Sequence, residues 1–190
     1  MMRSMRPALV LTLLMTILLG VLYPLAITGI AEVLFPAAAH GSLRLRDGIP
    51  IGSTLIGQQF TDPGYFWGRP SATTPQPYNG TASSGSNLGP LNPALMDSVK
   101  GALKALHDAD PDNRAPVPVE LVSASASGLD PDISPAAAEY QAARVARARH
   151  LPIERVDALI QAHLRPRLLG FIGEPRVNVL ELNLALDGLR

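Results

Sequence analysis

Residues 7–31 read PALVLTLLMTILLGVLYPLAITGIA, a run of 25 residues without a charged side chain between Arg6 and Glu32. A helix rises about 1.5 Å per residue, so this run reaches roughly 37 Å, more than the bilayer's hydrocarbon core of about 30 Å. Ala37-Ala38-Ala39 offers a signal-peptide cleavage motif, but the run is nearly twice as long as the apolar region of such a peptide. We therefore predict a retained transmembrane helix over residues 8–31.

Three residues inside the predicted span weaken helices in water: Gly20, Pro24 and Gly29. Membrane helices tolerate both residue types, and Pro24 can introduce a kink. Glycines also allow a second helix to approach closely. Gly20, Pro24 and Gly29 are therefore candidates for contact with another subunit.

The charges that flank the span decide its orientation only weakly. Arg3 and Arg6 precede it, and Arg44 and Arg46 follow it. The first pair is nearer the apolar run, which favours a cytoplasmic N-terminus with the bulk of the chain outside. This predicts a cytoplasmic segment 1–7, the span 8–31, a juxtamembrane segment 32–50 and an external domain 51–190.

The composition of the external part excludes several function classes. Acidic and basic residues balance in the whole chain, at 16 each, and no basic stripe suitable for nucleic acid appears. Cysteine is absent, so disulfides, thiol nucleophiles and thiolate metal sites are excluded. The length suffices for one domain with a hydrophobic core.

Hydrophobic periodicity and helix-start signals predict a mixture of helices and strands. The class is therefore an α+β soluble domain following a single N-terminal transmembrane helix. The expected elements are strands at 53–60 and 117–122, a helix from Asn92-Pro93, a helix from Ser134-Pro135 to about His150, a helix from Pro152 ended by Pro166, and a strand followed by a helix within 176–184.

Catalytic and metal motifs are not apparent. His40, His107, His150 and His163 lack the spacing of zinc ligands, and there is neither a nucleophile elbow nor a phosphate-binding loop of the Walker type. Asp130 and Asp132 flank Pro131; they could serve as an acid/base pair, but such residues more often cap a turn.

Three glycine-bearing segments, 52–58, 83–90 and 125–131, offer backbone N–H groups that could form an anion-binding nest. Tight turns between short elements are the simpler interpretation, and we favour it.

Several short runs are similar to one known family. The chain resembles KdpC, the C subunits of the bacterial Kdp high-affinity potassium-transporting P-type ATPase, along its whole length. One departure is Asp132, where that family usually has histidine. The matching runs are 52–53 (GS), 55–58 (LIGQ), 68–72 (GRPSA), 78–79 (YN), 85–90 (GSNLGP), 127–131 (SGLDP), 133–135 (ISP), 140–141 (YQ), 144–149 (RVARAR), 177–180 (VNVL) and 182–187 (LNLALD).

The resemblance implies a non-catalytic accessory subunit of an ATP-driven potassium importer in the bacterial inner membrane. Its partners would be the potassium-conducting A subunit, the ATP-hydrolysing B subunit and membrane lipid, with Arg69 as a further interface candidate. The family is described as a catalytic chaperone that raises the B subunit's affinity for ATP. The resemblance makes five residues candidates for contact with ATP that is shared with that subunit: Gln58, Ser84, Gly85, Ser86 and Asn87.

Direct contact with ATP conflicts with an external domain, because ATP lies on the other side of the bilayer. Coupling through the span avoids the conflict, and we favour assembly and stabilisation over nucleotide binding. The chain has no cofactor motif of its own, and potassium is the ion that the complex transports. The alternative functions are a membrane-anchored periplasmic ligand-binding domain and a hydrolase.

Overall fold

The computed structural model describes residues 2–189, and the chain divides into two compact units, Met1–Pro50 and Ile51–Arg190. Met1 and Arg190, the outer ends of the predicted N-terminal segment and external domain, lie outside the described residues. An apolar N-terminal helix precedes helices and small sheets, which confirms the predicted α+β arrangement.

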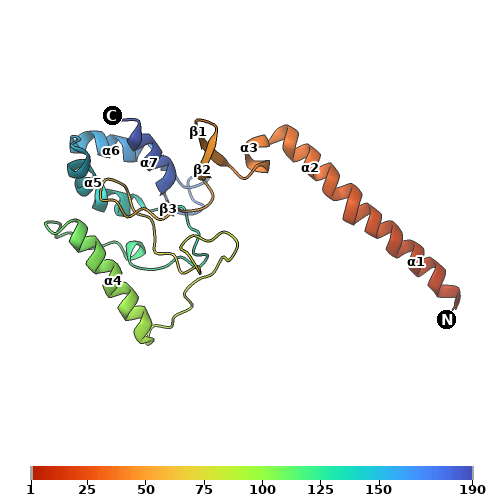
Figure 1. The fold of residues 1–190 in the computed structure, drawn as a ribbon. Coiled ribbons are helices and arrows are strands. Elements are labelled where there is room, and N and C mark those ends of the chain that lie inside the picture. The colour runs from red at the N-terminus through yellow and green to blue at the C-terminus, as the bar shows by residue number, and fades with distance from the viewer. Residues whose placement is uncertain (1, 190) are drawn as a thin grey trace. The chain divides into compact units, whose positions relative to one another are not determined.

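The first unit is dominated by a continuous helical rod (Figure 1). It consists of α1 (Met2–Ile17), a π-helical turn η1 (Leu18–Leu22) and α2 (Tyr23–Leu34). The stretch Ser4–Leu34 is long and apolar enough to cross a membrane, and none of its residues is buried. A short helix α3 (Pro36–Ala39) follows, and strands β1 (Leu43–Arg46) and β2 (Ile49–Ser53) form a two-stranded sheet.

The π-helical turn lies directly before Pro24. Proline lacks an N–H donor, and its ring collides with the carbonyl four residues earlier in a regular helix. Here the N–H of Tyr23 donates to the carbonyl of Leu18, five residues back. The wider turn accommodates Pro24, and the helix continues through this position.

The second unit has its core between three helices and a small antiparallel sheet. Helices α5 (Pro135–Arg149), α6 (Ile153–Ala162) and α7 (Val179–Asp187) lie together in Figure 1. The sheet has the order β3 (Asp132–Ile133), β5 (Arg176–Asn178), β4 (Leu164–Arg165), with Ile133 opposite Val177 and Leu164 opposite Val177. Fully buried core side chains include Phe66, Ile133, Val145, Val156, Ile160, Val177, Leu182 and Leu186.

The helix starts that capping residues predicted are confirmed. The Asn92 side chain accepts the N–H of Ala94 at the start of α4 (Pro93–Ala109). Ser134 accepts the N–H of Ala137 at the start of α5, at 3.1 Å. The strand-then-helix interpretation of 176–184 is also confirmed, since β5 leads directly into α7.

Two predicted strands are wrong. The strand β2 ends at Ser53, where the side chain accepts the N–H of Leu55 and starts a turn, so 54–60 is not a strand. Residues 117–122 contain a 3-10 turn, η2 (Val119–Leu121), in which the N–H of Leu121 donates to the carbonyl of Pro118; the Glu120 carboxylate accepts the N–H of Ser134 at the start of α5. Helix α6 ends at Ala162 rather than at Pro166, since β4 intervenes.

Long irregular segments are held by side chains instead of strands. The Asn183 amide exchanges two hydrogen bonds with the backbone of Phe66, at 2.9 and 3.0 Å. The Gln141 amide does the same for Trp67, at 2.8 and 3.1 Å. Two helical side chains thus replace a partner strand for consecutive loop residues, which fixes the segment that leads into the candidate site.

Candidate functional site

The three glycine-bearing loops predicted from the sequence meet in the second unit. The N–H of Gly57 donates to the carbonyl of Leu129 at 2.9 Å, and the N–H of Ser84 donates to the carbonyl of Ser127 at 2.9 Å. The middle of this arrangement is the segment 125–131, which contacts both other loops. We call residues 57–58, 68–79, 83–87 and 124–132 the loop cluster.

Arg69 and Ser71 connect the aromatic-rich segment, Tyr65-Phe66-Trp67, to the loop cluster. The Arg69 guanidinium pairs with the Asp130 carboxylate at 3.1 Å. The Ser71 hydroxyl donates to the carbonyl of Gly128 at 2.7 Å and accepts the N–H of Tyr78 at 2.8 Å. The two residues therefore tie segment 68–79 to segment 124–132.

The Tyr78 ring lies close to two glycines, and its hydroxyl donates to the carbonyl of Arg69 at 2.5 Å. A Cβ atom on Gly57 would lie 2.4 Å from the ring, and one on Gly68 would lie 2.8 Å from the hydroxyl oxygen. Burial and, to a smaller extent, the Asp130 carboxylate raise the pKa of Tyr78 to about 12, while Arg69 opposes the shift. The phenol is therefore neutral at physiological pH and acts as a hydrogen-bond donor.

Replacing Tyr78 with phenylalanine should reveal this shift as a pH dependence. An unfolded tyrosine loses its proton above about pH 10, whereas the folded Tyr78 keeps it up to about 12. The stability that the neutral phenol contributes is therefore present below pH 10 and is lost as pH rises through this window. We expect Tyr78→Phe to lower the melting temperature at pH 8 and to show a smaller deficit at pH 11, which lies between the unfolded and the folded pKa. An equal deficit at both pH values would contradict the assignment.

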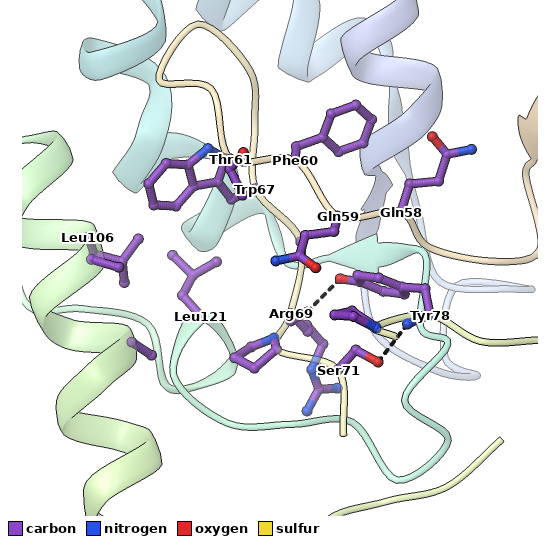
Figure 2. Close-up of a pocket in the computed structure, with 15 residues that line it drawn as sticks. Gln58, Gln59, Phe60, Thr61, Trp67, Arg69, Ser71, Tyr78, Leu106 and Leu121 are labelled. Carbon is purple, nitrogen blue, oxygen red and sulfur yellow. Dashed lines mark hydrogen bonds between the residues drawn. The ribbon is translucent and has the colours of Figure 1, made fainter. Parts of the chain in front are cut away.

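A pocket of about 510 Å³ adjoins the loop cluster (Figure 2). Helix α4 contributes Leu106, η2 contributes Leu121, and the aromatic-rich segment contributes Trp67. The lining is mainly apolar, and Figure 2 shows the Gln59 amide pointing into it between Trp67 and Tyr78. Such a pocket suits a flat apolar or aromatic group better than a highly charged one.

The residues named for nucleotide contact are not brought together in this pocket. Gln58 lies at its rim, but its side-chain amide donates to the carbonyl of Ile51 at 2.7 Å. None of the other four is among the lining residues: Ser84, Gly85, Ser86 and Asn87. Gln59 and Trp67 are lining residues that the sequence analysis missed; the aromatic-rich run at 65–67 was the available signal.

Backbone donors of the loops are used within the loop cluster. The N–H of Gly128 donates to the Ser125 hydroxyl at 2.9 Å, and the N–H of Leu129 donates to the Ser127 hydroxyl at 3.1 Å. Together with the N–H of Ser84, these donors are not available to an anion. The geometry thus favours tight turns over an anion-binding nest in this part of the cluster.

The two aspartates have structural partners. Asp130 pairs with Arg69 and accepts the N–H of Asp132 at 3.1 Å, as expected of a residue that caps a turn. Asp132 pairs with Arg176 at 2.8 Å and accepts from the Asn178 amide at 3.0 Å. Within residues 2–189, no group of three or more histidine, aspartate or glutamate side chains is arranged to hold a metal ion.

The two glycines of the span have open space where a side chain would stand. A Cβ atom on Gly20 would meet only a Thr16 methyl group, at 3.9 Å, and one on Gly29 would meet nothing within 4 Å. Gly20 lies within the π-helical turn that precedes Pro24. Both positions leave room for a neighbouring helix backbone to approach.

Comparison with known proteins identifies the family. A family model described as "KdpC: K+-transporting ATPase, c chain" matches residues 5–188. The chain belongs to the KdpC family. A Potassium-transporting ATPase KdpC subunit from Polaromonas naphthalenivorans is 67% identical over 186 residues, covering 98% of this chain and 95% of the relative. The corresponding subunit from Sorangium cellulosum is 61% identical over 190 residues and the full length of both chains.

KdpC membership assigns the chain to the C subunits of potassium-transporting ATPases, as the resemblance implied. A further relative from Variovorax paradoxus, with the same subunit name, is 66% identical over 182 residues, covering 96% of this chain and 94% of the relative. An N-terminal helix able to span a membrane fits a membrane-anchored KdpC subunit.

Proposed function

We propose that this chain is a non-catalytic subunit that assembles and stabilises an ATP-driven potassium importer of the inner membrane. Family membership over residues 5–188 is the observation that carries the proposal. The structure adds support, because the polar groups of the loop cluster pair with one another and not around an open reaction site. The partners would be the potassium-conducting and the ATP-hydrolysing subunits.

We propose that the span contacts these partners and that the second unit lies in the periplasm. The exposed apolar helix and its uncovered glycines support contact within the membrane. Arg69 is a weaker interface candidate than its place in the sequence suggested, because its guanidinium pairs with Asp130 inside the loop cluster. Its mutation would disturb the fold together with any contact.

We propose that any increase in ATP affinity reaches the ATP-hydrolysing subunit by coupling through the span. Two observations support coupling over contact. Among the residues named for nucleotide contact, the N–H of Ser84 donates to the carbonyl of Ser127, and the Gln58 amide donates to the carbonyl of Ile51. Titrating the full chain in detergent with millimolar ATP should give no binding heat, whereas saturable heat lost in Gln59→Ala would establish a direct nucleotide site in the pocket.

Deletion is the decisive test of the accessory role. Membranes that contain the other pump subunits without this chain should lose potassium-dependent ATP hydrolysis, and supplying the chain in trans should restore it. The purified chain alone should hydrolyse no ATP. Potassium-dependent hydrolysis at the full rate after deletion would refute the proposal.

The orientation can be read from a single introduced cysteine, since the chain has none of its own. Leu91 is 95% exposed, so Leu91→Cys should leave the fold intact. A membrane-impermeant maleimide should label it in intact spheroplasts if the second unit is periplasmic. Labelling only after the cells are broken would place the second unit in the cytoplasm and would restore direct ATP contact as a possibility.

Gly20→Leu should weaken assembly. A leucine side chain there would prevent a partner helix from approaching the backbone closely. We expect less of the other subunits to co-purify with this variant, while Ala26→Leu, which adds similar bulk elsewhere in the span, serves as the control. Equal recovery of the complex with both variants would show that the Gly20 face is not the interface.

A further inference from the structure

The connection between β4 and β5 carries an unusual concentration of exposed apolar side chains. Residues 168–172 read LLGFI, and the exposed fractions are 66% for Leu168, 76% for Leu169, 72% for Phe171 and 47% for Ile172. We call these five residues the apolar tip. Elsewhere in the second unit, exposed large apolar residues stand apart in the described sequence: Leu55, Leu91, Met96, Leu103, Val119 and Ile153.

The apolar tip is an ordered hairpin end. Leu168 and Ile172 exchange both backbone hydrogen bonds, each at 2.9 Å. Leu169 and Gly170 have φ of 52° and 83°, so a bulky residue takes a left-handed conformation that such residues rarely adopt. An ion pair between Arg167 and Glu174, at 2.6 Å, closes the hairpin below the tip.

Most backbone N–H groups of the tip are already hydrogen-bonded. Those of Leu168, Gly170, Phe171 and Ile172 donate to carbonyls within the hairpin. This pairing lowers the cost of moving the tip out of water, because each unsatisfied backbone group costs several kcal/mol in an apolar medium. The tip itself has no charged or polar side chain, and the nearby arginines Arg165, Arg167 and Arg176 are paired with carboxylates.

The chain's own span keeps a bilayer within reach of the tip. The 16 residues from Phe35 to Pro50 join the helix to the second unit, and a fully extended chain of that length reaches at most about 55 Å. A membrane is therefore always near this domain, whichever side it occupies. The tip has no polar side chain that could form a directed hydrogen bond with a protein partner. Lipid acyl chains need no such bond, so they suit a small apolar projection better.

We propose that the apolar tip inserts into the interfacial layer of the bilayer in which the chain is anchored, with lipid acyl chains around Leu169 and Phe171. Apolar side chains of peripheral segments enter this layer to a depth of about 5–10 Å. The domain would then be held to the membrane at a second point besides the span.

The absence of cysteine allows a direct test in the full chain. Phe171→Cys carries an environment-sensitive fluorophore in liposomes that contain lipids with a quencher on the acyl chain, and Leu91→Cys is the exposed control. We expect a blue-shifted emission and strong quenching at position 171, and emission like that of the free dye in water at position 91. Identical aqueous emission at both positions would overturn the proposal.

A second pair of variants separates lipid from protein contact. A label at Leu169→Cys should be quenched by the same lipids, and adding Phe171→Asp should abolish that quenching without changing the melting temperature. Shielding that occurs only when other pump subunits are added, or only at high chain-to-lipid ratio, without quenching by the lipid probe, would mean a protein contact and would refute insertion.

Discussion

Arg144→Leu should destabilise the second unit by roughly 3 kcal/mol, because it would remove three hydrogen bonds made by a buried guanidinium. Arg144 is 3% exposed, and its guanidinium donates to the carbonyls of Pro63 and Tyr65 and to the Gln141 amide oxygen. It also lies 4.4 Å from the centre of the Trp67 ring. Burial lowers the pKa of Arg144 to about 10, so the side chain is still charged at pH 7.

The expected readout is a fall in melting temperature of roughly 10 °C, with earlier proteolysis in residues 62–70. Arg155→Leu makes the same chemical change on the neighbouring helix α6 at an exposed position. That control should change the melting temperature little. Similar melting temperatures for the two variants would show that Arg144 does not anchor the aromatic-rich segment.

Gly128→Ala should disrupt the loop cluster at its centre. Gly128 has φ of 66°, and an added Cβ would lie 2.6 Å from the carbonyl oxygen of Ser84 and 2.6 Å from the Thr73 methyl group. Backbone strain and overpacking together should cost about 2–4 kcal/mol. The Ser71 bond to the Gly128 carbonyl would also be displaced, which transmits the change to the pocket.

Gly101→Ala is the matched control, and it should have the opposite sign. Gly101 lies inside α4, and an added Cβ would meet nothing within 4 Å. Alanine is favoured over glycine in a helix interior by about 1 kcal/mol. Thermal unfolding of both variants, with limited proteolysis at 83–87, separates the two effects. A Gly128→Ala protein as stable as Gly101→Ala would contradict the close packing of the loops.

The helices were predictable because their signals are local. Asn92 and Ser134 cap the helices that follow them. Proline fits the next position because the first helical residue needs no N–H for the helix. The prediction of a strand at 53–60 was wrong for a local reason. The Ser53 hydroxyl accepts the N–H of Leu55, which starts a turn in place of a strand. The 3-10 turn at 119–121 carries Glu120, which accepts the N–H of Ser134; hydrophobic periodicity gives no sign of such a contact.

The candidate site was predictable in part only. The glycine-bearing loops were identified, but their convergence depends on pairs far apart in the chain, such as Ser71 with Gly128 and Arg69 with Asp130. Of two adjacent glutamines, Gln58 was chosen, yet Gln59 points into the pocket. Neighbouring residues in an extended segment face opposite ways, so the choice depends on where the segment packs.

The π-helical turn before Pro24 changes how the span should be mapped. One extra residue in a turn rotates everything after it by about 100° relative to an unbroken helix. A helical wheel drawn over residues 8–31 would therefore place side chains beyond Tyr23 on the wrong side. In a cysteine cross-linking scan, the reactive positions should recur with the helical period both before Leu18 and after Tyr23. The second series should be shifted by one residue relative to the first.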